Sequence, residues 1–181
     1  VIAYCATARK YKGWQKVIVS SDKDFIQLLD DETILYRPTQ KQVLNKMRVV
    51  EEYGIHPNNF ALARAMAGDK NDNLPGVGGV GLPTVKKRFP FLAEERSYKI
   101  TELLKYCKSV DSKIKAYHNV IEGRKLLKEN YKLMQLYAPN ISVQTKTRIR
   151  NVIGKPDMTY NKTEIVKMMV LDGFGEFNWS G

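Results

Sequence analysis

The β-branched run over residues 16–21 constrains the fold more than any other segment of this 181-residue chain. Consecutive Val and Ile side chains without polar alternation are typical of a strand that is buried on both faces, as in a parallel sheet. A short helix is predicted over residues 25–29, and a second strand over residues 33–36, closed by Pro38. The predicted fold class is therefore α/β, with residues 1–40 forming part of a parallel-sheet core.

The chain begins inside a helical pattern over residues 1–8, with no capping residue ahead of it. The strands that would complete a sheet around residues 16–21 are also not all present. We expect that a segment is missing upstream of Val1.

Residues 41–90 predict helices separated by a glycine-rich loop. One helix is expected over residues 41–53, ending at Gly54, and a second from Pro57 to the glycine at position 68. A loop follows through residue 81, and a third helix begins at Leu82. Residues 91–181 form a helical carboxy-terminal region, with helices expected over residues 94–108, 111–136 and 162–171.

The charge of the chain points to a polyanionic partner. Its 30 Lys and Arg against 19 Asp and Glu give a net charge of +11, which attracts nucleic acid over a Debye length. A basic ribosomal or nucleoid protein would have the same balance, so charge alone leaves that alternative open.

Cysteine content and hydropathy indicate the cellular compartment in which the chain is expected. Cys5 and Cys107 are too far apart in sequence for a Cys-x-x-Cys site and too few for a disulfide framework, so we expect two buried thiols in a reducing cytoplasm. No apolar run approaches the ~20 residues that span a bilayer. The sequence predicts a cytoplasmic protein, of a bacterial or phage-infected cell, without a membrane partner.

Four aspartates form two pairs that predict a metal site. Asp22 and Asp24 follow the first strand, at the carboxyl end where open α/β sheets bind ligands. Asp69 and Asp72 lie in the glycine-rich loop. Carboxylates are the ligands that Mg²⁺ prefers, and two such ions ~4 Å apart can stabilise both the attacking and the leaving oxygen of a phosphodiester. The alternative makes Asp22 a helix cap and the other pair turn formers.

The glycine-rich segment before the third helix predicts a phosphate-binding site. Glycines let the backbone N–H groups approach a phosphate, and the following helix start and basic side chains add positive charge. Such contacts read no base, so binding should follow DNA shape and fall steeply with salt. The alternative is a turn-rich loop followed by a solvated basic helix. The candidate DNA-binding residues are Gly76, Val77, Gly78, Gly79, Val80, Gly81, Thr84, Lys86, Lys87 and Arg88.

Three segments, residues 19–28, 53–57 and 68–81, together resemble the flap endonucleases, phage 5′-nucleases and the 5′-nuclease domains of bacterial DNA polymerases. The resemblance covers about residues 1–90. It implies a nuclease core, a helix–three-turn–helix that binds DNA, and active-site metals, two Mg²⁺ or Mn²⁺ ions, held by Asp22, Asp24, Asp69 and Asp72. It also implies a K⁺ ion at the hairpin of residues 76–81.

The function that the resemblance implies is that of a structure-specific 5′-nuclease. Such an enzyme, a flap endonuclease or 5′-3′ exonuclease, hydrolyses phosphodiester bonds of branched or nicked DNA, or of RNA primers, during DNA replication. The alternative is a non-catalytic DNA-binding subunit whose aspartates complete the site of a partner.

Two departures from the family pattern limit the resemblance. Pro83 stands where the family has a basic residue, so Lys86 and Lys87 would have to supply that phosphate contact. The amino-terminal Asp strands and basic helical arch of the family have no counterpart before Val1. We therefore predict little nuclease activity from this chain alone, and activity when an amino-terminal fragment is supplied in cis or in trans.

Smaller signals lie outside these motifs. The isolated His56 and His118 are expected to have no catalytic role. The aromatic tail over residues 173–179 is expected to pack back on the body or to dock a partner such as a single-strand binding protein. A second DNA-facing surface or a set of solvated helix faces would equally explain Lys105, Lys108, Lys113, Lys115, Arg124, Lys125 and Lys128.

Overall fold

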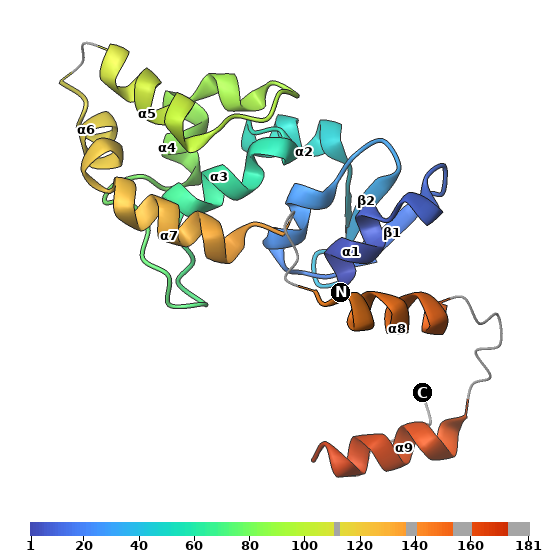
Figure 1. Ribbon diagram of the computed structural model, residues 1–181. Helices are drawn as coiled ribbons and strands as arrows, with labels where there is room; N and C mark the ends of the chain where they lie inside the picture. The colour runs from blue at the N-terminus through green and yellow to red at the C-terminus, as the bar shows by residue number, and fades with distance from the viewer. Residues whose placement is uncertain (111–112, 137–140, 154–160, 174–181) are drawn as a thin grey trace. The chain divides into compact units, whose positions relative to one another are not determined.

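The fold is described from a computed structural model (Figure 1), which describes residues 1–110, 113–136, 141–153 and 161–173. The chain divides into two compact units, residues 1–140 and 141–181, and each is described by itself. The expected tail over residues 174–179 lies outside the described residues. The division of the chain at residues 40 and 90 stays a prediction.

The first unit contains a small sheet with strand order β1-β2-β3. Strands β1 (Lys16–Val19) and β2 (Thr33–Arg37) pair in parallel, and the 3₁₀ helix η2 (Lys23–Leu28) lies in the connection between them. Helix α1 (Ile2–Thr7) and the 3₁₀ helix η1 (Arg9–Tyr11) precede the sheet. The predicted α/β class and the two parallel strands are confirmed.

One expectation for β1 is wrong, because the strand is buried on one face only. Ile18 is 7% exposed, whereas Val17 and Val19 are 54% and 64% exposed. The strand register places these two valines on one face of the sheet with three further apolar side chains from β2 and β3, Ile34, Tyr36 and Val43. Parallel sheets are usually covered on both faces, so this largely open apolar face is a distinctive feature of the unit.

The helix expected over residues 41–53 is a strand followed by a shorter helix. Strand β3 (Gln42–Leu44) pairs antiparallel to β2 after a turn in which Lys41 has a φ of 49°. Helix α2 (Lys46–Tyr53) begins only where the Asn45 side chain accepts a hydrogen bond from the Arg48 N–H at 2.9 Å. The cap at position 45 therefore sets the start of the helix.

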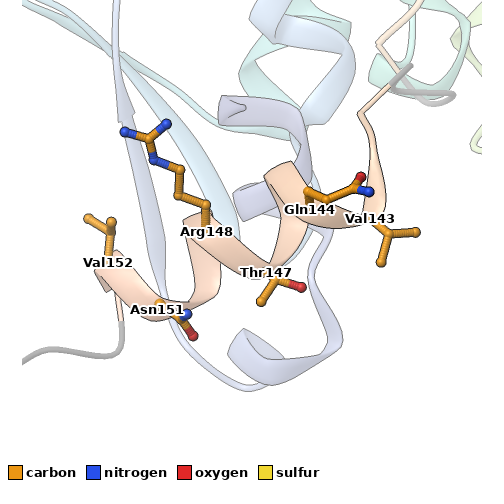
Figure 2. A pocket seen from close by; sticks show the side chains of 6 residues that line it. All are labelled: Val143, Gln144, Thr147, Arg148, Asn151 and Val152. Atoms are coloured by element: carbon orange, nitrogen blue, oxygen red, sulfur yellow. The ribbon is translucent and has the colours of Figure 1, made fainter.

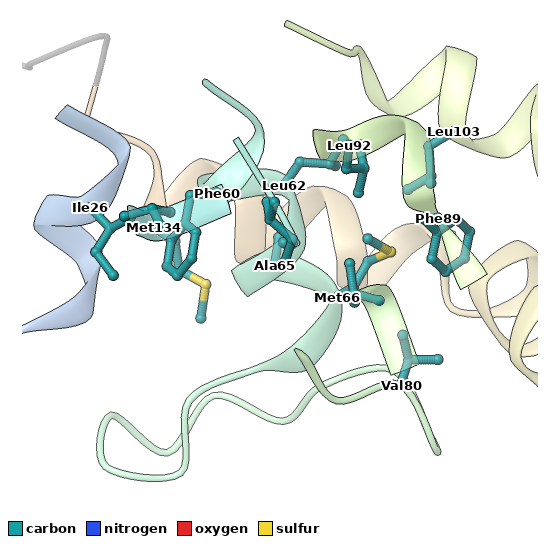
Figure 3. Close-up of a cluster of buried hydrophobic side chains, with 14 of the residues drawn as sticks. Ile26, Phe60, Leu62, Ala65, Met66, Val80, Phe89, Leu92, Leu103 and Met134 are labelled. Carbon is teal, nitrogen blue, oxygen red and sulfur yellow. The ribbon is translucent and has the colours of Figure 1, made fainter. Parts of the chain in front are cut away.

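Helix α3 (Pro57–Ala67) forms the centre of the first unit. It is apolar on nearly all sides, with Phe60, Ala63, Ala65 and Met66 fully buried, which is the pattern of a core helix. It packs against η2, α7 (Arg124–Met134) and α4 (Leu82–Arg88). Figure 3 shows the side chains of α3 between those of η2 and of the helices that follow in sequence.

The helix expected from residue 94 begins at α5 (Ile100–Ser109), after the 3₁₀ helix η3 (Pro90–Ala93). The buried Asn59 side chain holds the intervening segment in an irregular conformation. Its Nδ2 donates to the carbonyls of Leu92, Glu94 and Arg96, and its Oδ1 accepts from the Tyr98 N–H. The Asn59 side chain thus forms the hydrogen bonds that these carbonyls and this N–H would form with other backbone groups in a helix.

The helix expected over residues 111–136 is two helices, α6 (Lys115–Glu122) and α7, that meet at Gly123. In the second unit, α9 (Lys162–Leu171) matches the predicted last helix, whereas α8 (Val143–Ile153) was not predicted. A shallow hollow along α8, lined by six of its own side chains (Figure 2), contains none of the candidate site residues. In the described part of the chain, no helix is long and apolar enough to cross a membrane.

The two thiols should differ sharply in reactivity. Cys107 lies buried on α5, and burial raises its pKa to about 11, whereas Cys5 is half-buried. At pH 8 only about one Cys107 in a thousand would be a thiolate. We expect one fast-reacting thiol in a titration with Ellman's reagent, and its loss in Cys5→Ser. Fast labelling of the Cys5→Ser variant would contradict the packing of α5.

Candidate metal and phosphate site

The first aspartate pair lies at the carboxyl end of β1. Asp22 caps η2, with its Oδ1 accepting from the Asp24 N–H at 2.8 Å, and its own N–H donates to the Ser20 Oγ at 3.1 Å. This capping role, one of the two readings of the sequence, fixes the backbone of the loop. It leaves the second oxygen of the Asp22 carboxylate available to a ligand.

The second pair lies in a tight loop that begins where α3 ends. Asp69 and Leu74 form an antiparallel bridge with two backbone hydrogen bonds of 2.8 Å each. The Asp69 Oδ1 accepts from the Asn71 N–H at 2.9 Å, and Asn73 has a φ of 54°. Asp69 is thus a turn former, and Asp72 is exposed on the same turn.

Arg64 on α3 joins the two segments. Its Nε donates to the Asp24 Oδ1 at 3.1 Å, and its Nη2 forms an ion pair with the Asp69 Oδ2. Its Nη1 also donates to the Gly68 carbonyl at 3.4 Å. The guanidinium is the planar fork that suits two carboxylates, so residues 45 positions apart in sequence become neighbours through one side chain.

Burial and charge shift the pKa of these groups in different directions. Burial raises the pKa of the Asp24 carboxyl, and the nearby Asp22 and Asp69 carboxylates add to that rise, although Arg64 opposes it. Burial also acts to raise the pKa of Asp69, but hydrogen bonds from the Asn71 N–H and from Arg64 outweigh it and lower the pKa. The site is therefore rich in partly desolvated negative charge, which a cation would stabilise.

The aspartates fit a divalent cation by donor type, but the structure brings only some of them together. Asp24 and Asp69 meet at Arg64 with Asp22 beside them, while Asp72 makes no contact with Arg64. Among the described residues, no three carboxylate, His or Cys side chains are grouped closely enough to hold a metal ion. Carboxylate oxygens nevertheless remain the ligands that Mg²⁺ prefers.

Two glycines allow the loop after α3 to fold back on the helix end. Gly68 has a φ of +74°, and a Cβ there would lie 2.3 Å from the Gly76 N. A Cβ at Gly76 would lie 2.2 Å from the Ala67 carbonyl oxygen. Backbone therefore packs directly on backbone at both positions, which only glycine permits.

The hairpin of residues 76–81 presents backbone N–H groups to solvent. Val77 and Val80 are buried and anchor it, and the Val77 N–H donates to the Met66 carbonyl at 2.8 Å. The N–H groups of Gly78, Gly79 and Gly81, by contrast, donate no hydrogen bond within residues 1–110 and 113–136. Clustered free N–H groups of this kind suit an anion.

The basic residues after the hairpin have different surroundings. The Lys86 Nζ donates to the Glu51 and Glu52 carbonyls at 3.2 and 3.0 Å and so caps the end of α2. Lys87 is exposed and Arg88 is half-buried. Of the two lysines suggested as substitutes for the missing contact at Pro83, Lys87 is the one left free to meet a phosphate.

Comparison with known proteins shows that about half of this chain is similar to 5′-nucleases. Over 84 residues, 46% of the chain, it is 39% identical to a 5′-3′ exonuclease of Aquifex aeolicus. Over 87 residues it is 37% identical to the thermostable DNA polymerase I of Thermus aquaticus, covering 48% of the chain and 10% of the polymerase. A structure of phage T5 5′-exonuclease with bound zinc matches 75% of the chain with a TM-score of 0.61 at 21% identity.

These matches support a 5′-nuclease family for the matched part of the chain. No family model matches it. The chain spans 29% of the length of the Aquifex exonuclease and 49% of the T5 protein. A second T5 structure, a flap endonuclease with DNA and metal ions, matches with a TM-score of 0.54 at 22% identity. The fold of the chain is therefore shared with proteins solved with divalent metals and with DNA.

Sequence reasoning missed several buried polar residues that position the site. Arg64 was the main residue missed. It is the single charged residue in the otherwise apolar helix α3, and a buried arginine is almost always paired with an acidic group. Its place in the helix was therefore a signal in the sequence. Two amides, Gln27 and Asn130, and the partly exposed Asn119 also contact the site loops. They carried no comparable signal, because each has a backbone partner more than 40 residues away in sequence.

Removing Arg64 should destabilise the chain. Arg64→Met would leave two partly buried carboxylates without their cation, so we expect the free energy of unfolding to fall by about 2 to 4 kcal/mol. The ion pairs of Lys46 with the exposed Asp31 and Glu95 provide a control, because ion pairs in solvent contribute little and Lys46→Met should cost much less stability than Arg64→Met. Urea unfolding in EDTA measures both, and equal losses would contradict a special role for Arg64.

Alanine should be tolerated at one hairpin glycine and not at another. Gly76→Ala would force a methyl group onto the Ala67 oxygen, so a loss of about 2 kcal/mol or more is expected. Gly81→Ala is the matched control, because its φ is −87° and the nearest atom to an added Cβ is 3.7 Å away. Thermal unfolding distinguishes the two variants, and equal melting temperatures would exclude the close backbone contact.

Proposed function

We propose that this chain provides the duplex-binding surface and part of the metal site of a structure-specific 5′-nuclease, which hydrolyses phosphodiester bonds of flaps, nicks or RNA primers. The observation that carries the proposal is the contact of Arg64 with both Asp24 and Asp69. That contact brings two aspartate segments together next to a hairpin with free backbone N–H groups.

In this proposal Asp22, Asp24, Asp69 and Asp72 are ligands of two divalent ions, Mg²⁺ or Mn²⁺. When bound, the ions supply Lewis-acid stabilisation of the charge that develops on the scissile phosphodiester. Arg64 holds Asp24 and Asp69 at a fixed spacing before an ion arrives. Burial of Asp24 disfavours its charged form, so the carboxylate gains more from a cation than an exposed one would.

Helix α3, the loop of residues 68–81 and α4 act as a helix–three-turn–helix in this proposal. The N–H groups of Gly78, Gly79 and Gly81 bind a duplex phosphate, with or without a K⁺ ion, and Thr84 and Lys87 lie close by in sequence. These contacts read no base edge, so binding depends on DNA shape and on salt. Lys86 contributes indirectly, through its packing over Gly54 and its cap on α2.

A second nuclease segment, supplied in cis or in trans, completes the site in this proposal. Two observations support it. No three metal-binding side chains are grouped among the described residues, and the sheet has an open apolar face that includes Val17, Val19 and Val43. A strand added in parallel to the free edge of β1 would end beside Asp22, where a further carboxylate is needed.

A non-catalytic DNA-binding subunit is the second candidate function. The incomplete grouping of carboxylates favours it. In that case the aspartates would serve only as the helix cap and turn formers that the structure contains.

Cleavage and binding of a labelled 5′-flap duplex separate the two functions. We expect the chain to bind the flap in EDTA and to cleave it with Mg²⁺ only when the remaining segment of a related 5′-3′ exonuclease is added. Asp24→Asn and Asp69→Asn should each reduce that cleavage at least a hundredfold, the scale of losing a group that acts in the transition state, and should leave binding in EDTA within about twofold.

The control is Asp172→Asn, a change of the same kind on the second unit, which should affect neither activity nor binding. Flap binding without any Mg²⁺-dependent cleavage, with or without the added segment, would favour the non-catalytic subunit. Failure to bind the flap would exclude both functions.

A further inference from the structure

Gln27 connects the first aspartate segment to the end of α7. Its side chain is 1% exposed, and its Nε2 donates to the Asp24 carbonyl at 2.8 Å and to the Met134 carbonyl at 2.9 Å. Its Oε1 accepts from the Leu136 N–H at 2.8 Å. One buried amide therefore holds the backbone of Asp24 against the carboxyl end of α7.

Asn130 connects the second aspartate segment to the middle of α7. Its side chain is 2% exposed, and its Nδ2 donates to the Ala65 carbonyl at 3.1 Å and to the Pro75 carbonyl at 2.9 Å. Ala65 lies in the last turn of α3, whose carbonyls lack partners within the helix. Pro75 closes the loop that carries Asp69. The same helix thus holds both ends of that loop.

The start of α7 lies at the phosphate hairpin. Gly123, which separates α6 from α7, packs on Val77, because a Cβ added there would lie 3.3 Å from the Val77 Cγ2. Asn119 on α6 donates to the Gly78 carbonyl at 2.7 Å. Helix α7 packs along α3 (Figure 1), so it reaches from the hairpin to the Asp24 segment.

The links through α7 differ from the link through Arg64 in one respect. Arg64 uses the carboxylate oxygens of Asp24 and Asp69, which are the proposed metal ligands. The bonds of Gln27 and Asn130 described above join backbone carbonyls and an N–H, and none of them uses those carboxylate oxygens. If a cation displaced Arg64 from the carboxylates, α7 would still hold the two segments at the same spacing.

We propose that α7 is a brace that sets the spacing between the two aspartate segments, with Gln27 and Asn130 as its positioning residues. Its role in metal binding rests on the proposed function, whereas the mechanical coupling does not. Each buried amide forms hydrogen bonds with two or more backbone groups. Removing it leaves those groups buried without that hydrogen-bond partner. Loss of one link should therefore loosen both segments.

Hydrogen exchange of the whole chain, followed by mass spectrometry, tests the coupling. Asn130→Leu keeps the approximate volume and removes both donated bonds, and Gln27→Leu does the same for the other link. Each variant should speed exchange at least threefold in both segments, residues 22–29 and 69–77. Leu133→Ala, on the exposed side of α7, is the matched control and should change neither segment.

A second control accounts for general loss of stability. Leu103→Ala removes a fully buried side chain on α5, far in sequence from both segments. Faster exchange confined to the segment next to the substituted residue would contradict the proposal that α7 couples the two segments. The same two-segment pattern in Leu103→Ala would overturn it as well.

Mn²⁺ binding, measured by electron paramagnetic resonance, tests the role in metal binding. We expect Asn130→Leu and Gln27→Leu to weaken Mn²⁺ binding by about tenfold, as for other residues that orient metal ligands. The Leu133→Ala and Leu103→Ala chains should bind as the original does. Unchanged affinity in the two brace variants would refute the positioning role. Absence of Mn²⁺ binding in the unsubstituted chain would count against the proposed function. The hydrogen-exchange result alone would then decide whether α7 couples the two segments.

Discussion

The guanidinium of Arg64 is the contact on which the arrangement of the site depends. It lies on a helix that is otherwise apolar, and it pairs with one carboxylate from the loop after β1 and one from the loop after α3. A buried cation of this kind is tolerated only when it is fully paired, so the packing of α3 against η2 and the position of Asp24 and Asp69 depend on each other. This side chain joins the apolar core helix directly to the carboxylates of the polar site.

The backbone around this contact has little freedom to move. Gly68 and Gly76 bring two backbone segments into direct contact, and the carbonyls in the last turn of α3 are satisfied by the Gly68 and Val77 N–H groups and by Asn130. The hairpin that follows is held by two buried valines, and the N–H groups of Gly78, Gly79 and Gly81 donate no hydrogen bond to the described residues of the first unit. The rigid part of the loop thus lies next to the core, and the part available to a phosphate lies in solvent.

Sequence patterns predicted the elements with strong local signals and failed where distant contacts decide. The parallel strands, α3 and α9 followed from β-branched runs, apolar spacing, and Pro and Gly boundaries. Strand β3 was missed because it depends on pairing with β2, and the late start of α5 depends on Asn59, whose partners lie more than 30 residues away. The aspartates and glycines could be identified from their order. Arg64 was marked only by its single charge in an apolar helix, and Gln27 and Asn130 had no such signal, because the roles of these residues arise only when separate segments meet.

In the proposed function, the two aspartate segments form parts of one divalent-metal site. Titration of Mn²⁺ into the chain, followed by electron paramagnetic resonance, tests it with three proteins: the unsubstituted chain, Asp24→Asn and Asp69→Asn. We expect the unsubstituted chain to bind Mn²⁺ and either substitution to weaken the same binding event, because both carboxylates serve one site. Binding that survives both substitutions, or that responds to only one of them, would contradict it.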